Sequence, residues 1–512
     1  MDFSHSKNIL RKKSCKPLLI SCLLVALTSC NSVPATYTDT KDKLDIYPDY
    51  GDVFIPYNIA PLNFHINNEA SSYVTKIYST NGKSILVRGK DVQMNLKDWK
   101  ALLRNNKGND LFFEVYLKHG KSWSRFPLIK NHITAETIDK YAVYRAIQPL
   151  YTKYEDMSIN QRDLENFEVT ILIDNRIFST NSNGHCINCH SFQNYNSTGN
   201  MQLHIRGKNG GTVLLFDHKH KKVNPKAKGL LSGSVYPSWH PTLNYIAYST
   251  NTIGQNFHSK NQDKVEVLDS KSDLILYNVE KNEVTKITDS RDWLETFPYW
   301  SPDGNYLYYV AAKFKPKQDS IETEIETEMI LNYQRIKYNI IRIPFNQKTM
   351  TFGKADTIFN AASIGKSATF PRVSPDGKYL LFSMADYGNF HIWHKNSDLF
   401  LMDLSTRELK NIDVMNSPDV ESYHAWSSSG RWIIFSSRRE DGAYTRLYIS
   451  YFDKDGKAHK PFILPQKDPM FYKHYFKSFN IPEFIVKPAK TNRHKLFKTA
   501  SGEAEVATLV NH

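Results

Sequence analysis

A chain of 512 residues is long enough for two or three domains with substantial hydrophobic cores. Aromatic residues make up 13% of it, a composition that favours strands over helices. The formal net charge is +14, and the excess basic residues are spread along the chain. In a protein exported by the N-terminal signal described below, this charge argues against a nucleic-acid partner.

The N-terminus has the features of a processing signal. A basic start is followed by a short apolar run at residues 18–27, too short to span a bilayer, and then by Leu27-Thr28-Ser29-Cys30. This order resembles the signal peptide and lipobox of bacterial lipoproteins. The resemblance implies that residues 1–29 are removed and that Cys30 is diacylated. The alternatives are an ordinary secretory signal or a buried apolar segment.

Export would set the surroundings of the rest of the chain. Apolar residues show no periodic spacing over residues 30–45, so this segment is expected to form a flexible tether. We expect a membrane-anchored lipoprotein of the cell envelope, facing the periplasm because residues 31–34 carry no acidic run. A basic balance there favours anionic lipid, glycan or an acidic redox partner, and no nucleic acid.

Residues 46–180 are expected to form an N-terminal β-rich region. Within it, residues 46–134 have the apolar spacing of a small β-sandwich-like domain, with strong strand candidates at 111–117 and 123–129. Residues 95–103 are expected to form a short helix with Asn95 as its N-cap. The segments 141–145 and 167–173 are apolar and also strand-like.

Residues 186–190 read Cys-Ile-Asn-Cys-His, the spacing that attaches a c-type haem. Two thiols three positions apart can each form a thioether with a haem vinyl group, and the adjacent imidazole becomes the proximal iron ligand. We therefore assign Cys186 and Cys189 to covalent haem c and His190 to the iron. The flanks are rich in Asn, Ser and Gly, so residues 181–204 are expected to form a haem-attachment loop, more solvent-exposed than in a compact cytochrome.

Other uses of the Cys pair stay open. The chain has five cysteines, and Cys186 and Cys189 are the two left once Cys15 and Cys22 are removed and Cys30 is acylated. They could form a disulfide or a redox pair, although a redox Cys-x-x-Cys usually begins a helix. A zinc site is less favoured because it normally needs four N or S ligands.

The sixth iron ligand is open between Met201 and His204, which are the nearest Met and His in sequence. A thioether would raise the redox potential of the haem and an imidazole would lower it. The alternatives are core packing for Met201 and a hydrogen-bonded loop histidine for His204.

An internal repeat begins after residue 205. Its copies start near residues 236, 297, 370 and 423, and the clearest reads Trp-Ser-Pro-Asp-Gly-Asn-Tyr-Leu at 300–307. Ser-Pro-Asp-Gly is turn chemistry in which Gly adopts a positive φ. A strand, a turn and three further strands make one propeller blade. Degenerate pieces at 211–217 and 475–484 could supply more, so about five to six blades are expected.

The repeat resembles that of TolB-like β-propellers, and the whole chain resembles envelope lipoproteins that join such a propeller to a Cys-x-x-Cys-His site. The expected fold is all-β: a β-sandwich-like domain, a TolB-like propeller over residues 205–486, and a basic, disordered tail over 487–512. The resemblance implies haem c, a membrane anchor and a propeller face that binds an envelope protein or glycan.

No nucleophile elbow, His-Glu-x-x-His motif or phosphate loop is present in the sequence, and the chain is more readily interpreted as a non-enzyme. His391, Trp393, His394 and His424 are the best remaining polar-aromatic candidates, expected in loops at the channel mouth, with a structural role as the alternative. We expect an electron-transfer or redox-sensing lipoprotein. The alternatives are a non-catalytic binding module whose haem is structural or absent and, more weakly, a hydrolase or lyase.

Overall fold

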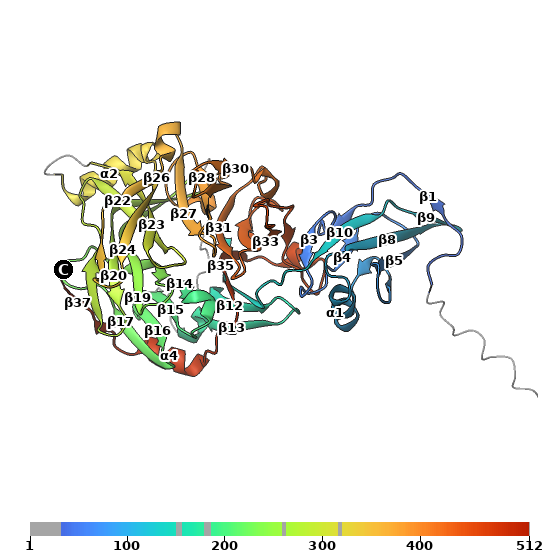
Figure 1. The fold of residues 1–512 in the computed structure, drawn as a ribbon, viewed down its shortest axis with the longest axis horizontal. Helices are drawn as coiled ribbons and strands as arrows, with labels where there is room; N and C mark the ends of the chain where they lie inside the picture. The colour runs from blue at the N-terminus through green and yellow to red at the C-terminus, as the bar shows by residue number, and fades with distance from the viewer. Residues whose placement is uncertain (1–31, 150–155, 179–185, 259–262, 316–319, 511–512) are drawn as a thin grey trace, which may run out of the picture.

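The computed structural model describes residues 32–149, 156–178, 186–258, 263–315 and 320–510. It is mostly β, as predicted. Figure 1 shows a small N-terminal domain beside a larger assembly of antiparallel sheets, which has the organisation of a β-propeller. The lipidation candidate Cys30 lies outside the described residues.

The N-terminal domain contains two sheets and one helix. The larger sheet contains β1 (Thr38–Asp39), β3 (Phe54–Pro56), β5 (Ser72–Tyr78), β6 (Ile85–Arg88), β8 (Asp110–His119), β9 (Ser122–Arg125) and β10 (Ile129–Thr134). The smaller sheet contains β2 (Ile46–Tyr47), β4 (Phe64–Ile66) and β7 (Asp91–Val92).

Helix α1 (Leu96–Arg104) completes this domain, close to its predicted span. The Asn95 side chain accepts hydrogen bonds from the backbone N–H groups of Lys97 and Asp98, so the predicted N-cap is confirmed. Trp99 of the helix is fully buried with Phe113 of the large sheet. Both sheets and the helix therefore share one core.

The larger body consists of six consecutive four-stranded antiparallel units within the described residues. The units are numbered here from the strand that contains the Cys-x-x-Cys-His motif. Unit 1 contains β14 (Cys186–Phe192), β15 (Met201–Arg206), β16 (Gly211–Phe216) and β17 (Lys219–Asn224). Unit 2 contains β18 (Ser234–Trp239), β19 (Tyr245–Phe257), β20 (Val265–Asn278) and β21 (Glu283–Lys286). Unit 3 contains β22 (Trp293–Trp300), β23 (Tyr306–Lys313), β24 (Asn339–Asn346) and β26 (Asp356–Phe359), with β25 (Thr351–Phe352) beside them.

The remaining units follow the same order. Unit 4 contains β27 (Ser367–Val373), β28 (Tyr379–Ala385), β29 (Asp398–Asp403) and β30 (Leu409–Lys410). Unit 5 contains β31 (Glu421–Trp426), β32 (Trp432–Ser437), β33 (Arg446–Tyr451) and β34 (Phe462–Ile463). Unit 6 contains β35 (Ser478–Ile485), β11 (Tyr141–Ile147), β12 (Ser158–Asp163) and β13 (Val169–Asp174).

The helical segments between strands are short. The α-helices outside the N-terminal domain are α2 (Glu322–Asn332), α3 (Phe471–His474) and α4 (Arg493–Ser501). The 3-10 helices whose bounds lie in the described residues include η3 (Asn175–Phe178), η4 (Asn194–Asn196), η5 (Tyr333–Arg335), η6 (Ala361–Ile364), η7 (His391–Trp393) and η8 (Asp413–Met415). None of the helices in the described residues is long and apolar enough to cross a membrane.

The predicted Ser-Pro-Asp-Gly turns form as expected. The Ser301 hydroxyl accepts a hydrogen bond from the Tyr306 N–H (2.9 Å) and donates to Asp303, while Gly304 has a φ of 71°. Ser374 repeats the bond to the Tyr379 N–H at 2.9 Å. The hydroxyl thus holds the two arms of the hairpin together where Gly reverses the chain.

Unit 6 corrects the predicted domain boundary. Residues 141–174 were assigned to the N-terminal region, but β11 pairs with β35 in antiparallel register, from Tyr141 opposite Ile485 to Ile147 opposite Ser478. Unit 6 is therefore built from three strands that precede the Cys-x-x-Cys-His motif in the sequence and one strand near the C-terminus. The predicted degenerate pieces near 211–217 and 475–484 are strands β16 and β35.

Two further expectations were wrong. The expected haem-attachment loop at 181–204 contains β14 and, after η4, the start of β15; residues 181–185 lie outside the described part. The expected disordered tail contains α4 and two strands, β36 (Glu505–Val506) and β37 (Thr508–Leu509), which pair in parallel with β17 and β21. Leu496 and Ala500 of α4 are buried against unit 1, which explains why this basic segment is ordered.

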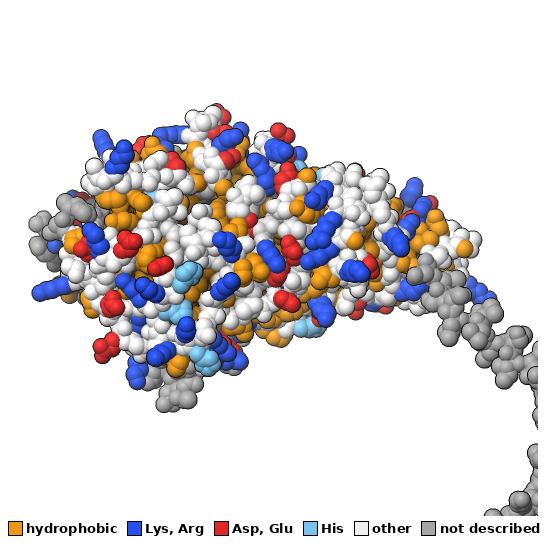
Figure 2. Space-filling view, turned by 60° about the horizontal axis from the view of Figure 1, so that its bottom comes forward, with side chains coloured by type: hydrophobic (Ala, Val, Ile, Leu, Met, Phe, Trp, Pro, Cys, Tyr) orange, Lys and Arg blue, Asp and Glu red, His pale blue; other side chains and the backbone are white. Residues whose placement is uncertain are grey.

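The N-terminal domain packs against unit 5. The Phe54 ring stacks on Tyr451 with centroids 5.7 Å apart, and the Trp432 indole N–H donates to the Thr137 carbonyl (3.0 Å). These contacts join the two bodies near β3 and β33, as Figure 1 shows. On the face shown in Figure 2, Lys and Arg side chains are scattered among Asp and Glu, in keeping with the diffuse charge.

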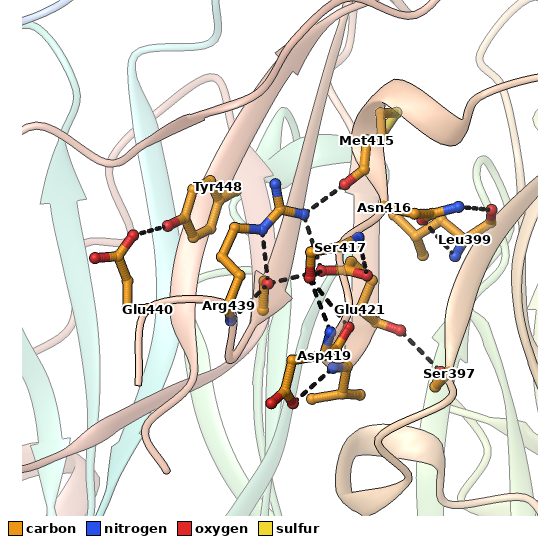
Figure 3. A network of polar contacts seen from close by, with 12 residues as sticks. Ser397, Leu399, Met415, Asn416, Ser417, Asp419, Glu421, Arg439, Glu440 and Tyr448 are labelled. Carbon is orange, nitrogen blue, oxygen red and sulfur yellow. Dashed lines mark hydrogen bonds and ion pairs between the residues drawn. The ribbon is translucent and has the colours of Figure 1, made fainter. Parts of the chain in front are cut away.

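A buried carboxylate at the start of unit 5 organises the network in Figure 3. Glu421 is fully buried and accepts hydrogen bonds from the Ser417 and Ser437 hydroxyls (2.6 and 2.8 Å) and from Arg439 Nη2 (2.8 Å). Ser417 lies in the loop before β31, Ser437 lies at the end of β32, and Arg439 lies in the turn that follows β32. The carboxylate therefore holds these segments of unit 5 together.

Replacing Glu421 with Ala should lower the free energy of unfolding by about 3 kcal/mol, because Arg439 would lose its buried counter-charge. Urea unfolding followed by tryptophan fluorescence measures the change. The Ser417→Ala variant, which removes one neutral donor, should cost only about 1 kcal/mol. Equal losses in the two variants would contradict this account of Glu421.

Candidate functional site

The Cys-x-x-Cys-His motif forms strand β14, the innermost strand of unit 1. Residues at positions i and i+3 of a regular strand face opposite sides of the sheet. Here the β14–β15 register shifts between Asn188 and Ser191, and Cys189 has a φ of 46°. This bulge redirects the Cys189 side chain, so Cys186 and Cys189 line the same cavity.

The cavity between the thiols and the facing units, called here the thiol cavity, has a volume of about 330 Å³, within the usual range for small-molecule sites. Two guanidinium groups, Arg145 from β11 and Arg206 from the end of β15, contribute to its wall. The remaining lining residues are mainly aromatic or aliphatic: Asn188, Tyr236, Ile253, Gln255, Val267, Phe390, Tyr423 and Ile481.

Both thiols are free. Burial raises the pKa of Cys186, while Arg145 and Arg206 oppose the shift. The Asn188 amide donates to Cys186 Sγ at 3.2 Å, and Met157 Sδ lies 3.9 Å away. A redox Cys-x-x-Cys normally has a lowered thiol pKa, so this environment does not favour that alternative. No cluster of three His, Cys, Asp or Glu suited to a metal ion occurs among the described residues, so the zinc alternative gains no support.

His190 is buried beside the thiol cavity. Neither ring nitrogen makes a hydrogen bond of normal geometry, and Nε2 lies 3.7 Å from Glu483 Oε1 on β35. Burial, with Arg145 adding to it, lowers the pKa of His190 to about 3. Burial also raises the pKa of Glu483 to about 8, although Arg372 opposes the shift. Both groups are therefore uncharged at neutral pH, and the imidazole is in the form that binds metals.

The two candidates for the sixth ligand lie on β15 and do not line the thiol cavity. Met201 is buried in an apolar cluster with Phe192 and residues of unit 6. The His204 ring lies 3.3 Å from the Thr212 hydroxyl, and burial lowers its pKa to about 3. The two thiols line the thiol cavity together, whereas Met201, His204 and also His190 are not among the residues that line it.

The other histidine candidates have structural partners. His391 and Trp393 are buried in η7, between β28 and β29. His394 Nε2 lies 3.0 Å from the buried Glu266 Oε2. His424 was expected in a loop but lies in β31, where Nε2 is 3.1 Å from the Leu381 carbonyl and burial lowers its pKa to about 3. None of the four lines the thiol cavity.

Sequence reasoning missed a second cavity, called here the tryptophan cavity, of about 370 Å³. It borders the thiol cavity, since Tyr423 and Ile481 line both. Arg372 supplies a guanidinium 4.7 Å from the Tyr299 ring, and Glu483 supplies a carboxyl group. Indoles from three units complete the wall: Trp239, Trp300 and Trp426. Three of the four predicted repeats place Trp directly before the turn, which was the available signal.

No protein-family model matches the chain, and no curated protein matches it either. Solved structures with a similar arrangement include a hypothetical selenium-binding protein from Sulfolobus tokodaii, at 8% identity and a TM-score of 0.37, covering 82% of this chain and 95% of that one. Another is a DUF4784 family protein from Bacteroides caccae, at 8% identity and a TM-score of 0.28, covering 73% and 97%. Prolyl oligopeptidase B from Galerina marginata matches at 10% identity and a TM-score of 0.35, covering 79% of this chain and 54% of that one. The description of the fold given above rests on the strand pairing of this chain and not on these similarities.

Proposed function

We propose that this protein is an envelope lipoprotein that carries one covalent c-type haem on Cys186 and Cys189, with His190 as an iron ligand. The observation that carries the proposal is that both thiols of the motif are free and line one cavity. Next to Cys189 in the sequence is His190, a buried and uncharged imidazole. This donor set fits a haem c.

The bound haem would supply one-electron chemistry, which suits electron transfer or redox sensing. The protein's own residues would enclose the group and exclude water from it. Burial of His190 keeps its imidazole neutral, so no proton has to leave before it binds iron. The choice of the sixth iron ligand between Met201 and His204 stays a prediction.

Taking each four-stranded unit as a blade, we propose a six-bladed propeller. This ring would serve as a platform for an envelope protein or glycan. The tryptophan cavity, with its indoles, one guanidinium and one carboxyl group, supports the second candidate function, a binding module in which the haem is structural or absent.

A haem measurement on the exported full-length chain tests the proposal. The protein is co-expressed with a periplasmic haem-attachment system, and a pyridine haemochrome spectrum and an intact mass are recorded. One haem per chain is expected. A colourless protein without a haem-sized mass addition would overturn the haem proposal and favour the binding module.

Membrane attachment is proposed through acylated Cys30. Replacing Cys30 with Ala should move most of the protein from the membrane fraction to the soluble fraction, because the acyl chains supply the anchoring energy. Immunoblots of separated fractions measure the distribution. A variant at Cys22, inside the expected signal peptide, is the control and should stay with the membrane. If the Cys30→Ala variant also stays there, the lipid anchor is wrong.

A further inference from the structure

Cys189 occupies a position that recurs in all six units. The innermost strand of each unit contains a register shift, and at each shift one residue has a positive φ. The six residues are Cys189 (46°), Tyr236 (50°), Phe297 (52°), Phe370 (54°), Tyr423 (43°) and Ile481 (52°). The haem motif is therefore built on a structural repeat of the propeller and is not an insertion into it.

Four of these six positions form a continuous row of aromatic rings. Ring centroids lie 4.1 Å apart for Tyr236 and Phe297, 4.4 Å for Phe297 and Phe370, and 4.5 Å for Phe370 and Tyr423. Because one ring comes from the inner strand of each successive unit, the row curves around the centre of the propeller. It is interrupted where units 6 and 1 contribute the smaller Ile481 and Cys189.

The thiol cavity lies against this interruption. Four of the six repeat positions line it: Cys189, Tyr236, Tyr423 and Ile481. The cavity is therefore enclosed by the inner strands themselves and lies at the centre of the propeller, not on a surface loop.

The charged side chains that line the thiol cavity are all positive. Its lining includes Arg145 and Arg206 but no carboxylate. Arg145 is 2% exposed and donates to Asn188 Oδ1 inside the motif, whereas Arg206 is exposed and lies opposite Cys186 in the β14–β15 register. Both guanidinium groups therefore lie beside the thiols. A haem held by these thiols would have its vinyl edge there, with both positive charges next to it.

We infer that the haem lies in the centre of the propeller, in the break of the aromatic row at Ile481 and Cys189, with Arg145 and Arg206 beside its thioether edge. This inference rests on the proposed function. It differs from the surface loop expected from the sequence, because only part of the haem edge would reach solvent.

Closing the break tests the location. The Ile481→Phe variant restores the aromatic residue that four other units carry at this position, so its backbone conformation is compatible with the fold. The haem-to-protein ratio should fall at least tenfold, with an unchanged circular dichroism spectrum. The matched control is Ala425→Phe, which adds a phenyl ring to the tryptophan cavity and should keep the wild-type ratio.

Charge removal tests whether the haem lies beside Arg206. The Arg206→Gln variant should have a lower midpoint potential than wild type, because a cation near the haem favours the reduced state, and Arg206→Lys should restore most of the shift. Arg342, which stacks on Tyr306 at 4.6 Å outside the thiol cavity, provides the control Arg342→Gln. Wild-type haem content in Ile481→Phe, or an unchanged potential in Arg206→Gln, would overturn the inference. Absence of haem from wild type would instead overturn the proposed function.

Discussion

Replacing Cys186 and Cys189 together with Ala should remove all covalent haem from the exported protein. The two thiols are the proposed attachment points, and no other cysteine occurs in the described residues. Intact mass should show the polypeptide alone, and the haemochrome absorbance should fall to background. Each single variant keeps one thiol and should lose only part of the signal.

The neighbouring Ser191→Ala variant is the control, since Ser191 lies on the same strand but supplies no thiol. It should retain the wild-type haem content. A haem-sized addition that survives in the double-alanine variant would contradict the assignment of both cysteines. Circular dichroism separates this outcome from a general loss of folding.

The Asp269→Asn variant should change how stability depends on pH. Asp269 is 2% exposed, and its Oδ2 accepts hydrogen bonds from the Asn251 and Asn389 amides (2.8 and 2.6 Å). Burial raises its pKa to about 7 against an unfolded value of 3.8. Above pH 4 the unfolded chain loses this proton while the folded chain keeps it, so stability declines until about pH 7.

The asparagine side chain does not ionise, so the variant escapes this decline. Relative to wild type, its free energy of unfolding should rise by up to about 4 kcal/mol between pH 4 and pH 8. Urea unfolding across this range measures the difference. Asp52→Asn, at an exposed position, serves as the control variant. A flat difference for Asp269→Asn would mean that this carboxyl is already ionised in the fold.

Local features of the fold were predictable from sequence. The Ser-Pro-Asp-Gly turns and the Asn95 cap depend on residues within five positions of one another, so their signals survive without tertiary context. Unit 6 depends on β11 meeting β35, more than 300 residues later, and it lacks the turn motif. Strand β14 was mistaken for a loop because its polar residues are buried inside the propeller, as Asn188 and Ser191 illustrate.

The candidate site was likewise predictable only in part. Spacing alone indicated Cys186, Cys189 and His190. The thiol cavity could not be predicted, because Arg145 and Ile481 reach it from two strands of unit 6 far apart in sequence and Phe390 reaches it from unit 4. The repeated positive φ at Cys189 was also hidden, since its counterparts in the other units are aromatic or aliphatic and share no residue type with it.

The pairing of β35 with β11 also has a consequence for biogenesis. During synthesis the N-terminal strands of unit 6 emerge first, and their partner β35 follows only from residue 478 onward. Until that late segment arrives, unit 6 has no inner strand beside Cys186 and Cys189. If haem is attached as proposed, the motif would be accessible to a maturation enzyme during this interval, and a chain truncated before residue 478 would lack the strand altogether.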